Sequence, residues 1–302
     1  MHLSQILLCW LGLGAATAIG HEQEYIGSDH LDKYNLSLTF DDLPTNASGI
    51  GYNGETNYTP LHYGDLYFQS FTVVNVAKAQ EDLPNPVDLL CASSAPNALF
   101  SHRHASNPWP RFSLHSLTDP SLPRDPNVTF TMRSIDISPV GSIPQNGLVI
   151  IWLNLLKLPP DDALDGGKNI LPWPELAGGA PIYAQGRIFQ LVAFFGPGPH
   201  PNVYINYDNF RRYNPEMGTK VDTFEVYAQL LKRSGPNEPY SVVADWEICL
   251  DNVVVEIAKK AGDKDDEEAG GASVRTFVLA GENGEVLDYQ DEGQKLMKEL
   301  RL

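Results

Sequence analysis

The run GLVIIWLNLL, Gly147 to Leu156, decides the fold class of this 302-residue chain. Side chains alternate across a β-strand, so every second residue of the run faces the same way. One face carries Val149, Ile151, Leu153 and Leu155, and the other carries Ile150, Trp152 and Asn154. The run therefore predicts a long strand with one wholly apolar face and one mixed face.

Nine further β-rich runs lie between segments dense in Pro, Gly, Asn and Asp, from Tyr34 to Ile257. They are NLSLTF, LYFQSFTVVNV, VDLLCAS, RFSLHSL, VTFTMRSIDI, GRIFQLVAFF, NVYINY, DTFEVYAQLL and YSVVADWEICLDNVVVEI. Ten such runs with almost no helical periodicity predict an all-β, two-sheet jelly-roll sandwich. Three long proline-bearing connections, 44–60, 102–126 and 158–181, are expected over one face.

Three more runs divide as the first one does. Their apolar faces carry Phe130, Met132, Phe189, Leu191, Ala193, Phe195, Phe224, Val226, Ala228 and Leu230. The opposite faces of the four runs carry Arg133, Trp152, Asn154, Gln190, Phe194, Glu225 and Tyr227. Aromatic and polar groups together are typical of a ligand-binding cleft. The alternative is that the long loops cover this sheet and its aromatics form a minor second core.

Loop aromatics next to prolines are expected at the rim of this cleft. Trp109 stands in NPWPR and Trp173 in LPWPE, and Tyr183 follows Pro181. Proline holds such side chains in place, so little conformational freedom remains to be lost on binding.

The N-terminus predicts export from the cell. Residues 1–18 combine an apolar run from Ile6 to Leu13 with a small-residue end, Ala16-Thr17-Ala18, which is a signal-peptide pattern. Four glycosylation sequons agree with a secreted protein, at Asn35, Asn46, Asn57 and Asn127. The sandwich domain is expected over 19–257, followed by a charged linker and tail over 258–302.

Cysteine usage and charge limit the chemistry. In an oxidising compartment the two cysteines left after signal cleavage, Cys91 and Cys249, predict one disulfide, with two buried free thiols as the alternative. The formal net charge of -17 argues against nucleic acid and anionic membranes as partners. No apolar stretch is long enough to span a membrane. Motifs of the common hydrolases, zinc proteases and nucleotide-binding proteins are missing from the sequence.

Three segments taken together carry a family resemblance: LTFDDLP (38–44), LHYGDLYFQSFTVVN (61–75) and WEICLDNVVVEI (246–257). They resemble a family of secreted fungal proteins that open with TFDDLP, continue with a G-L-x-F-x-x-F strand and end in a DN-V strand. Asp65 interrupts the usual Gly-Leu pair here. The resemblance implies a jelly roll like that of galactose-binding carbohydrate modules, in which acids near both ends hold a structural calcium ion.

Some members of this family are hetero-Diels-Alderases that join a tropolone o-quinone methide to a humulene-type olefin. The resemblance therefore implies a cofactor-independent pericyclase for small apolar and tropolone-like substrates. In that scheme Trp152, Phe194 and Tyr227 stack the reactants. Arg133 binds the tropolonate oxygens, and Glu225 or Tyr227 handles the proton.

Two alternatives remain open from the sequence. The first is a non-catalytic carbohydrate-binding or cell-wall protein, in which Trp152 and Tyr227 stack on sugars while Asn154 and Gln190 bind hydroxyls. The second concerns the acids: Asp41 or Asp42 binds calcium together with Asp251, or these carboxylates cap strand ends by accepting backbone hydrogen bonds.

Overall fold

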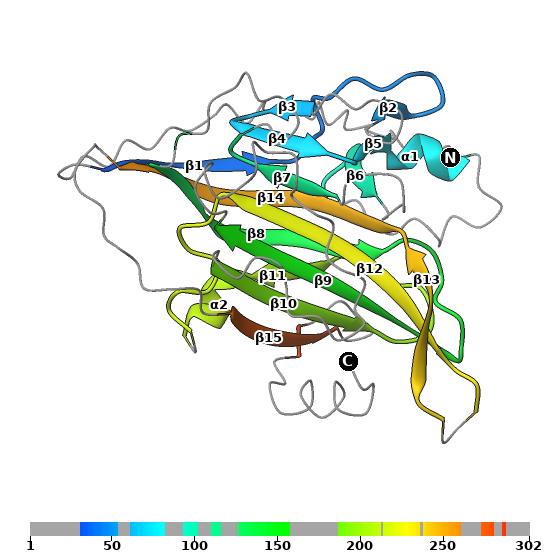
Figure 1. Ribbon diagram of the computed structural model, residues 1–302. Coiled ribbons are helices and arrows are strands. Elements are labelled where there is room, and N and C mark those ends of the chain that lie inside the picture. Colours follow the sequence, from blue (N-terminus) through cyan, green and yellow to red (C-terminus); the bar gives the residue numbers. More distant parts are fainter. Residues whose placement is uncertain are drawn as a thin grey trace, which may run out of the picture.

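Two β-sheets packed face to face form this computed structural model (Figure 1). It describes residues 31–53, 61–81, 93–101, 110–115, 125, 127–157, 187–212, 214–235, 238–260, 273–280 and 286–287. All pairings within the described sheets are antiparallel except that of β10 with β15. The chain is therefore an all-β sandwich, as predicted.

The two sheets have seven and nine strands. The seven-stranded sheet runs β11 (Val203–Asn206), β8 (Val128–Pro139), β14 (Ile248–Lys260), β6 (Asn97–Ser101), β5 (Thr72–Asn75) and β2 (Ile50–Asn53), with β1 (Leu31–Leu38) also paired to β14. The nine-stranded sheet runs β16 (Val286–Leu287), β15 (Ser273–Ala280), β10 (Arg187–Phe195), β9 (Gly147–Lys157), β12 (Thr223–Arg233), β7 (Arg111–Ser113), β4 (Leu66–Gln69) and β3 (Leu61–Tyr63), with β13 (Tyr240–Trp246) also on β12. Two short helices, α1 (Val76–Glu81) and α2 (Tyr207–Arg211), complete the described elements.

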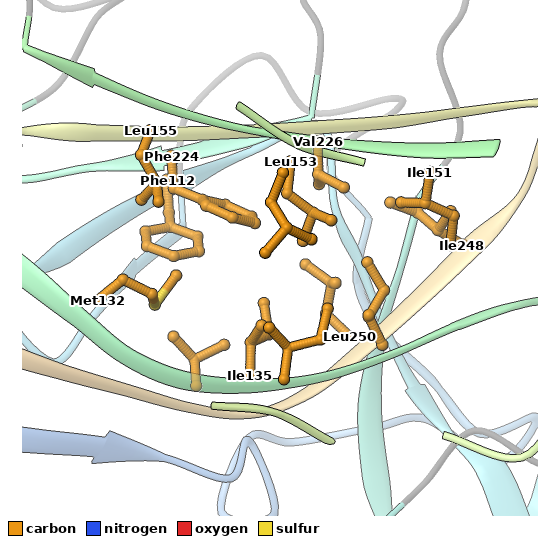
Figure 2. Packing of buried hydrophobic residues seen from close by; sticks show 14 of the residues in the cluster. Phe112, Met132, Ile135, Ile151, Leu153, Leu155, Phe224, Val226, Ile248 and Leu250 are labelled. Carbon is orange, nitrogen blue, oxygen red and sulfur yellow. The ribbon is translucent and has the colours of Figure 1, made fainter. Parts of the chain in front are cut away.

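The core lies between the sheets, and strand alternation predicted it correctly. Leu153 and Leu155 of β9 and Phe224 of β12 point toward Met132 of β8 and Leu250 of β14 (Figure 2). All the residues assigned to the apolar faces of the four long runs are buried in this one cluster. Side chains of this kind contribute about 1.5–3 kcal/mol each when buried, so the alternation alone fixes the inner face of each long strand.

Two runs that read as single strands are each divided between the sheets. LYFQSFTVVNV breaks at Ser70, which has a φ of 61°, so β4 joins one sheet and β5 the other. The last run breaks at Glu247, which places β13 in the nine-stranded sheet and β14 in the seven-stranded sheet. Both runs remain rich in β-forming residues across the break, so composition alone does not reveal it.

The predicted end of the domain at Ile257 differs from the structure. β14 continues to Lys260, and β15 and β16, from the segment expected to be linker and tail, add to the nine-stranded sheet (Figure 1). A parallel pair needs a long connection between its strands. Such a pairing cannot be read from the local sequence.

Asp41 of LTFDDLP and Asp251 of WEICLDNVVVEI, the two acidic segments near the ends of the domain, bind the same stretch of chain, residues 93–97. Oδ2 of Asp251 accepts the N–H groups of Ser93 and Ser94 at 2.8 and 2.7 Å. Oδ1 of Asp41 accepts the N–H of Asn97 at 3.0 Å. These are the backbone hydrogen bonds of the capping alternative, and they tie LTFDDLP and CLDNVVVEI to the start of β6.

Candidate functional site

A row of five polar side chains crosses the outer face of the nine-stranded sheet. The backbone register places one residue from each of five adjacent strands side by side. They are Gln190 of β10, Asn154 of β9, Glu225 of β12, Arg111 of β7 and Gln69 of β4. We call these five residues the polar row. Adjacent strands lie about 4.8 Å apart, so the row extends over roughly 19 Å.

All five members of the polar row are buried. The solvent-exposed fraction is only 2% for Glu225 and 7% for Arg111. Charged side chains are rarely buried without an opposite charge or hydrogen-bond partners. Here they occupy directly opposed register positions, where β-carbon atoms come within about 5 Å.

Hydrogen bonds connect neighbouring members of the row on both sides of Glu225 and Arg111. Nε2 of Gln190 donates to Oδ1 of Asn154 at 2.9 Å, and Nδ2 of Asn154 donates to Oε1 of Glu225 at 3.5 Å. On the other side Nε of Arg111 donates to Oε1 of Gln69 at 2.9 Å. The amides thereby orient one oxygen of the carboxylate and one nitrogen of the guanidinium group.

An aromatic pair lies directly beside the polar row. Trp152 and Tyr227 are register partners on β9 and β12, two residues along from Asn154 and Glu225, and so share their face. Their ring centroids are 6.0 Å apart with an interplanar angle of 15°. The distance from row to pair is about 6.6 Å along the strands, which is comparable to one aromatic ring.

Further along the same face lie Phe194 and Gln229. Phe194 pairs with Ile150 of β9, and Ile150 pairs with Gln229 of β12. Oε1 of Gln229 is buried and has no hydrogen-bond partner among the atoms of the described residues. Leaving a buried acceptor unpaired costs about 1–3 kcal/mol. This oxygen is therefore available to a hydroxyl or N–H donor of a ligand.

The burial of this face agrees with the second-core alternative and not with an open cleft. Trp152 and Tyr227 are 0% and 1% exposed, and Phe194 is 1% exposed. An open surface would leave such large rings in contact with solvent. A ligand that binds beside them must displace the protein atoms that now cover them.

The prediction that Arg133 faces Glu225 is wrong. Arg133 belongs to β8 in the seven-stranded sheet, and its guanidinium group pairs with Glu256 and with Asp208 at 3.1 Å. Glu225 lies on the outer face of the other sheet, across the core. Alternation within a strand was read correctly, but it does not say which sheet a strand joins. Arg111 is the cation that the structure places next to Glu225.

Arg111 and Gln69 were missed from the sequence, whereas alternation already places Gln229 on the same strand face as Glu225 and Tyr227. Arg111 begins RFSLHSL, a run expected to be a strand, so its alternation was available. The signal that could have found it is the pairing of β7 with β12, a contact between residues more than a hundred positions apart.

Several predicted residues lie outside the described part of the chain. They are Trp109, Trp173, Tyr183, Cys91 and Asn57. Cys249 is buried and disulfide-bonded, while its pairing with Cys91 stays a prediction. Of the other sequons, Asn35, Asn46 and Asn127 all have exposed side chains.

The carboxylates proposed for calcium do not fit a cation site. Oδ1 of Asp251 accepts the N–H of Asn252 at 2.7 Å, and Oδ2 is taken by Ser93 and Ser94. Asp42 accepts the hydroxyl of Tyr63. These donors point at the oxygen atoms that a cation would need. Among the described residues no group of three or more His, Cys, Asp or Glu side chains could hold a metal ion.

Burial and hydrogen bonding act against each other at Asp251. Its side chain is fully buried, which raises the pKa to about 6, while the N–H and hydroxyl donors around it lower the pKa by less. At Tyr63, burial and the Asp42 carboxylate both raise the pKa of the phenol, so it stays protonated and donates to Asp42. The hydrogen bonds of Asp251 to Ser93 and Ser94, and of Tyr63 to Asp42, therefore stabilise the fold.

Comparisons with protein-family models, with curated proteins and with solved structures found no match to this chain. In the described part of the chain no helix is both long and apolar enough to cross a membrane.

Proposed function

We propose that the protein is a secreted, cofactor-independent hetero-Diels-Alderase whose site is the polar row and the Trp152–Tyr227 pair. The observation that carries this proposal is a buried carboxylate and a buried guanidinium group, Glu225 and Arg111, beside a stacked aromatic pair. We also propose that the sandwich has jelly-roll topology with the long proline-bearing connections over this face.

The first chemical step is formation of the o-quinone methide from a hydroxymethyl tropolone. The ring hydroxyl gives up its proton, the bond from carbon to the hydroxymethyl oxygen breaks, and the leaving hydroxide takes a proton to become water. Glu225 accepts the first proton and can return it to the leaving oxygen. Arg111 holds the tropolonate oxygens through its fork of N–H donors.

The second step is the cycloaddition itself. The enone of the quinone methide and one double bond of the humulene form a carbon-carbon and a carbon-oxygen bond, and no atom is lost. Such a reaction needs the two partners held in one orientation and water excluded, and effective molarity can supply about 7–11 kcal/mol at best. Trp152 and Tyr227 would present flat apolar surface to the planar ring once the atoms that cover them are displaced.

Burial of this face argues against an open carbohydrate-binding platform, and a substrate of the proposed reaction also reaches it only by displacing the atoms that cover Trp152 and Tyr227. A sugar-binding platform presents its aromatic rings to solvent, whereas Trp152 and Tyr227 are 0% and 1% exposed. Oε1 of Gln229, about 13 Å from Glu225 along β12, can accept from a hydroxyl at the far end of a bound substrate.

The direct test is to incubate the purified full chain with humulene and a hydroxymethyl tropolone. We expect adduct to form faster and with higher stereoselectivity than in buffer. Glu225→Gln should lower the rate by about 10²-fold or more, the usual contribution of a positioned acid or base. Arg111→Lys should also lower it, because an ammonium group cannot make the bidentate contact.

Matched variants separate chemistry from folding. Asp136→Asn changes a buried acid of the seven-stranded sheet, and Arg211→Lys changes a half-buried arginine of α2, so both should keep the full rate. Circular dichroism confirms that each variant is folded before its rate is compared. Adduct formation no faster than in buffer, or full rates in both site variants, rules the proposal out.

A further inference from the structure

A groove lies on the outer face of the seven-stranded sheet, on the opposite side of the sandwich from the polar row. Its volume is about 440 Å³, and it crosses β1, β14, β8 and β11. Its walls include Asn35, Arg133, Tyr204, Asn206, Asp208 and Glu256. No step of the proposed reaction uses these residues, so the groove calls for a separate explanation.

Opposite charges in and around this groove are paired with one another. Arg133 pairs with both Asp208 and Glu256, and Glu256 also pairs with Lys33 at 3.6 Å. Arg211 adds a second cation at Asp208. These three cations and two carboxylates are engaged with one another, so a strongly charged ligand finds no cluster of unpaired charge of one sign. Exposed carboxylate, guanidinium and amide groups in close proximity suit a neutral ligand that carries many hydroxyl groups.

Tyr204 gives the groove one apolar wall. Its side chain is 54% exposed, while its neighbours on β11, Val203 and Ile205, are fully buried. Among the described residues it is the one exposed large aromatic side chain. A half-exposed tyrosine at a polar groove presents a flat face and a hydroxyl, the pair of features that binds the apolar face and the hydroxyls of a pyranose ring.

Asn35 places a source of sugar inside this groove. It opens the sequon Asn35-Leu36-Ser37 on β1, its side chain is exposed, and its register partner is Glu256. A glycan attached to its amide nitrogen begins at the groove wall. The sequons at Asn46 and Asn127 are also exposed but are not among the residues that line the groove.

We infer that this groove binds the chain's own glycan on Asn35, with a sugar ring of that glycan packed on Tyr204. Asn35 and Tyr204 lie at opposite ends of the groove, on strands separated by β14 and β8, about 14 Å across the sheet. They are also offset along the strands, because the register of Asn35 reaches Thr131 of β8 while Tyr204 pairs with Asp136, so the total span is roughly 20 Å. The first sugar lies over Glu256 and Arg133, and a later ring of the core reaches Tyr204. The glycan thereby covers an exposed aromatic on the face that does not carry the proposed reaction.

The test is enzymatic release of glycans from the native, full-length protein made in a secreting eukaryotic host. Glycopeptide mass spectrometry first shows which sequons are modified. We expect release from Asn35 to be about tenfold slower than from Asn127, the factor that 1.4 kcal/mol of contact energy gives. After denaturation the two sites should release at the same rate.

Two variants make the result specific. Tyr204→Ala should remove the protection at Asn35, while Val242→Ala, at an exposed apolar residue of β13 in the other sheet, should leave it intact. The inference is overturned by an unmodified Asn35 in a chain modified at Asn127. It is equally overturned by equal release in the native state, or by protection that survives in Tyr204→Ala. None of these outcomes depends on the Diels-Alder assay.

Discussion

Replacing Asp251 by asparagine should change how the stability of the protein depends on pH. The carboxyl group has an ordinary pKa of 3.8, and burial raises this to about 6 in the fold. A difference of about 2 between the folded and unfolded pKa values corresponds to about 3 kcal/mol of free energy of unfolding.

The direction of the pH dependence follows from which protonation state of the Asp251 carboxyl group the fold favours. Because the folded-state pKa is the higher one, the fold favours the protonated carboxyl group. Its stabilising contribution is fully present below pH 3.8 and is lost as the pH rises to about 6. In Asp251→Asn this loss cannot occur. The variant should be less stable overall, because its amide oxygen can replace Oδ2 toward Ser93 and Ser94 but its NH₂ group cannot accept the Asn252 N–H that Oδ1 accepts. The deficit should shrink by up to about 3 kcal/mol across that window.

The assay is urea unfolding followed by tryptophan fluorescence, at a series of pH values from below 3.8 to above 6. Asp42→Asn is the control, because it removes the same charge from an exposed position. The quantity of interest is the difference in unfolding free energy between Asp251→Asn and the natural chain. A difference that stays constant over the window, or that grows as the pH rises, refutes the reasoning and shows that the surrounding donors outweigh burial.

Three further predictions concern the buried charges, two tyrosine hydroxyl groups and metal binding. Arg111→Met and Glu225→Gln should each cost about 3–5 kcal/mol in urea unfolding, because each change removes the opposite charge beside a buried one. Together they should cost much less than the sum, and additive costs would contradict their coupling. Tyr207→Phe should lower the free energy of unfolding by less than about 0.5 kcal/mol, since the buried hydroxyl has no hydrogen-bond partner among the described residues. Tyr63→Phe should lower it by about 1 kcal/mol, because its hydrogen bond to Asp42 is lost. Equal losses of stability in thermal melts of the two variants argue against this reasoning. A chelator should leave the melting temperature unchanged, and a drop would restore calcium as a ligand of the acidic segments.

The inner face of every long strand could be predicted because alternation is a local property. Val149, Ile151, Leu153 and Leu155 need only the sequence of β9 to be assigned to one side, and the core bears them out. The sheet that each strand joins is not local. Arg133 has the right alternation for an outer face, but of the wrong sheet, because β8 pairs with β14 and β11 rather than with β9.

The candidate site, too, could be predicted only where local alternation was enough. Asn154, Gln190 and Glu225 were chosen from alternation alone, and the register brings all three into one row. Their fourth neighbour, Arg111, sits on a three-residue strand whose pairing is set by contacts distant in sequence. Short strands carry too little pattern for their partners to be chosen, so a residue on one of them is found only in the structure.

The polar row is more than the sandwich itself requires. On the same face Ile150, Val192 and Leu156 occupy comparable positions and are equally buried, so apolar side chains fit there. Burying Glu225 and Arg111 carries a desolvation cost that apolar residues avoid, and replacing such a pair by well-packed apolar side chains is often neutral or stabilising. Departures from what the fold needs are expected at functional sites. By contrast, Asp251 of β14 holds the segment just before β6 through backbone groups, which stabilises the fold. This difference is the reason why we propose the outer face of the nine-stranded sheet, and not the Asp251 region, as the site of the reaction.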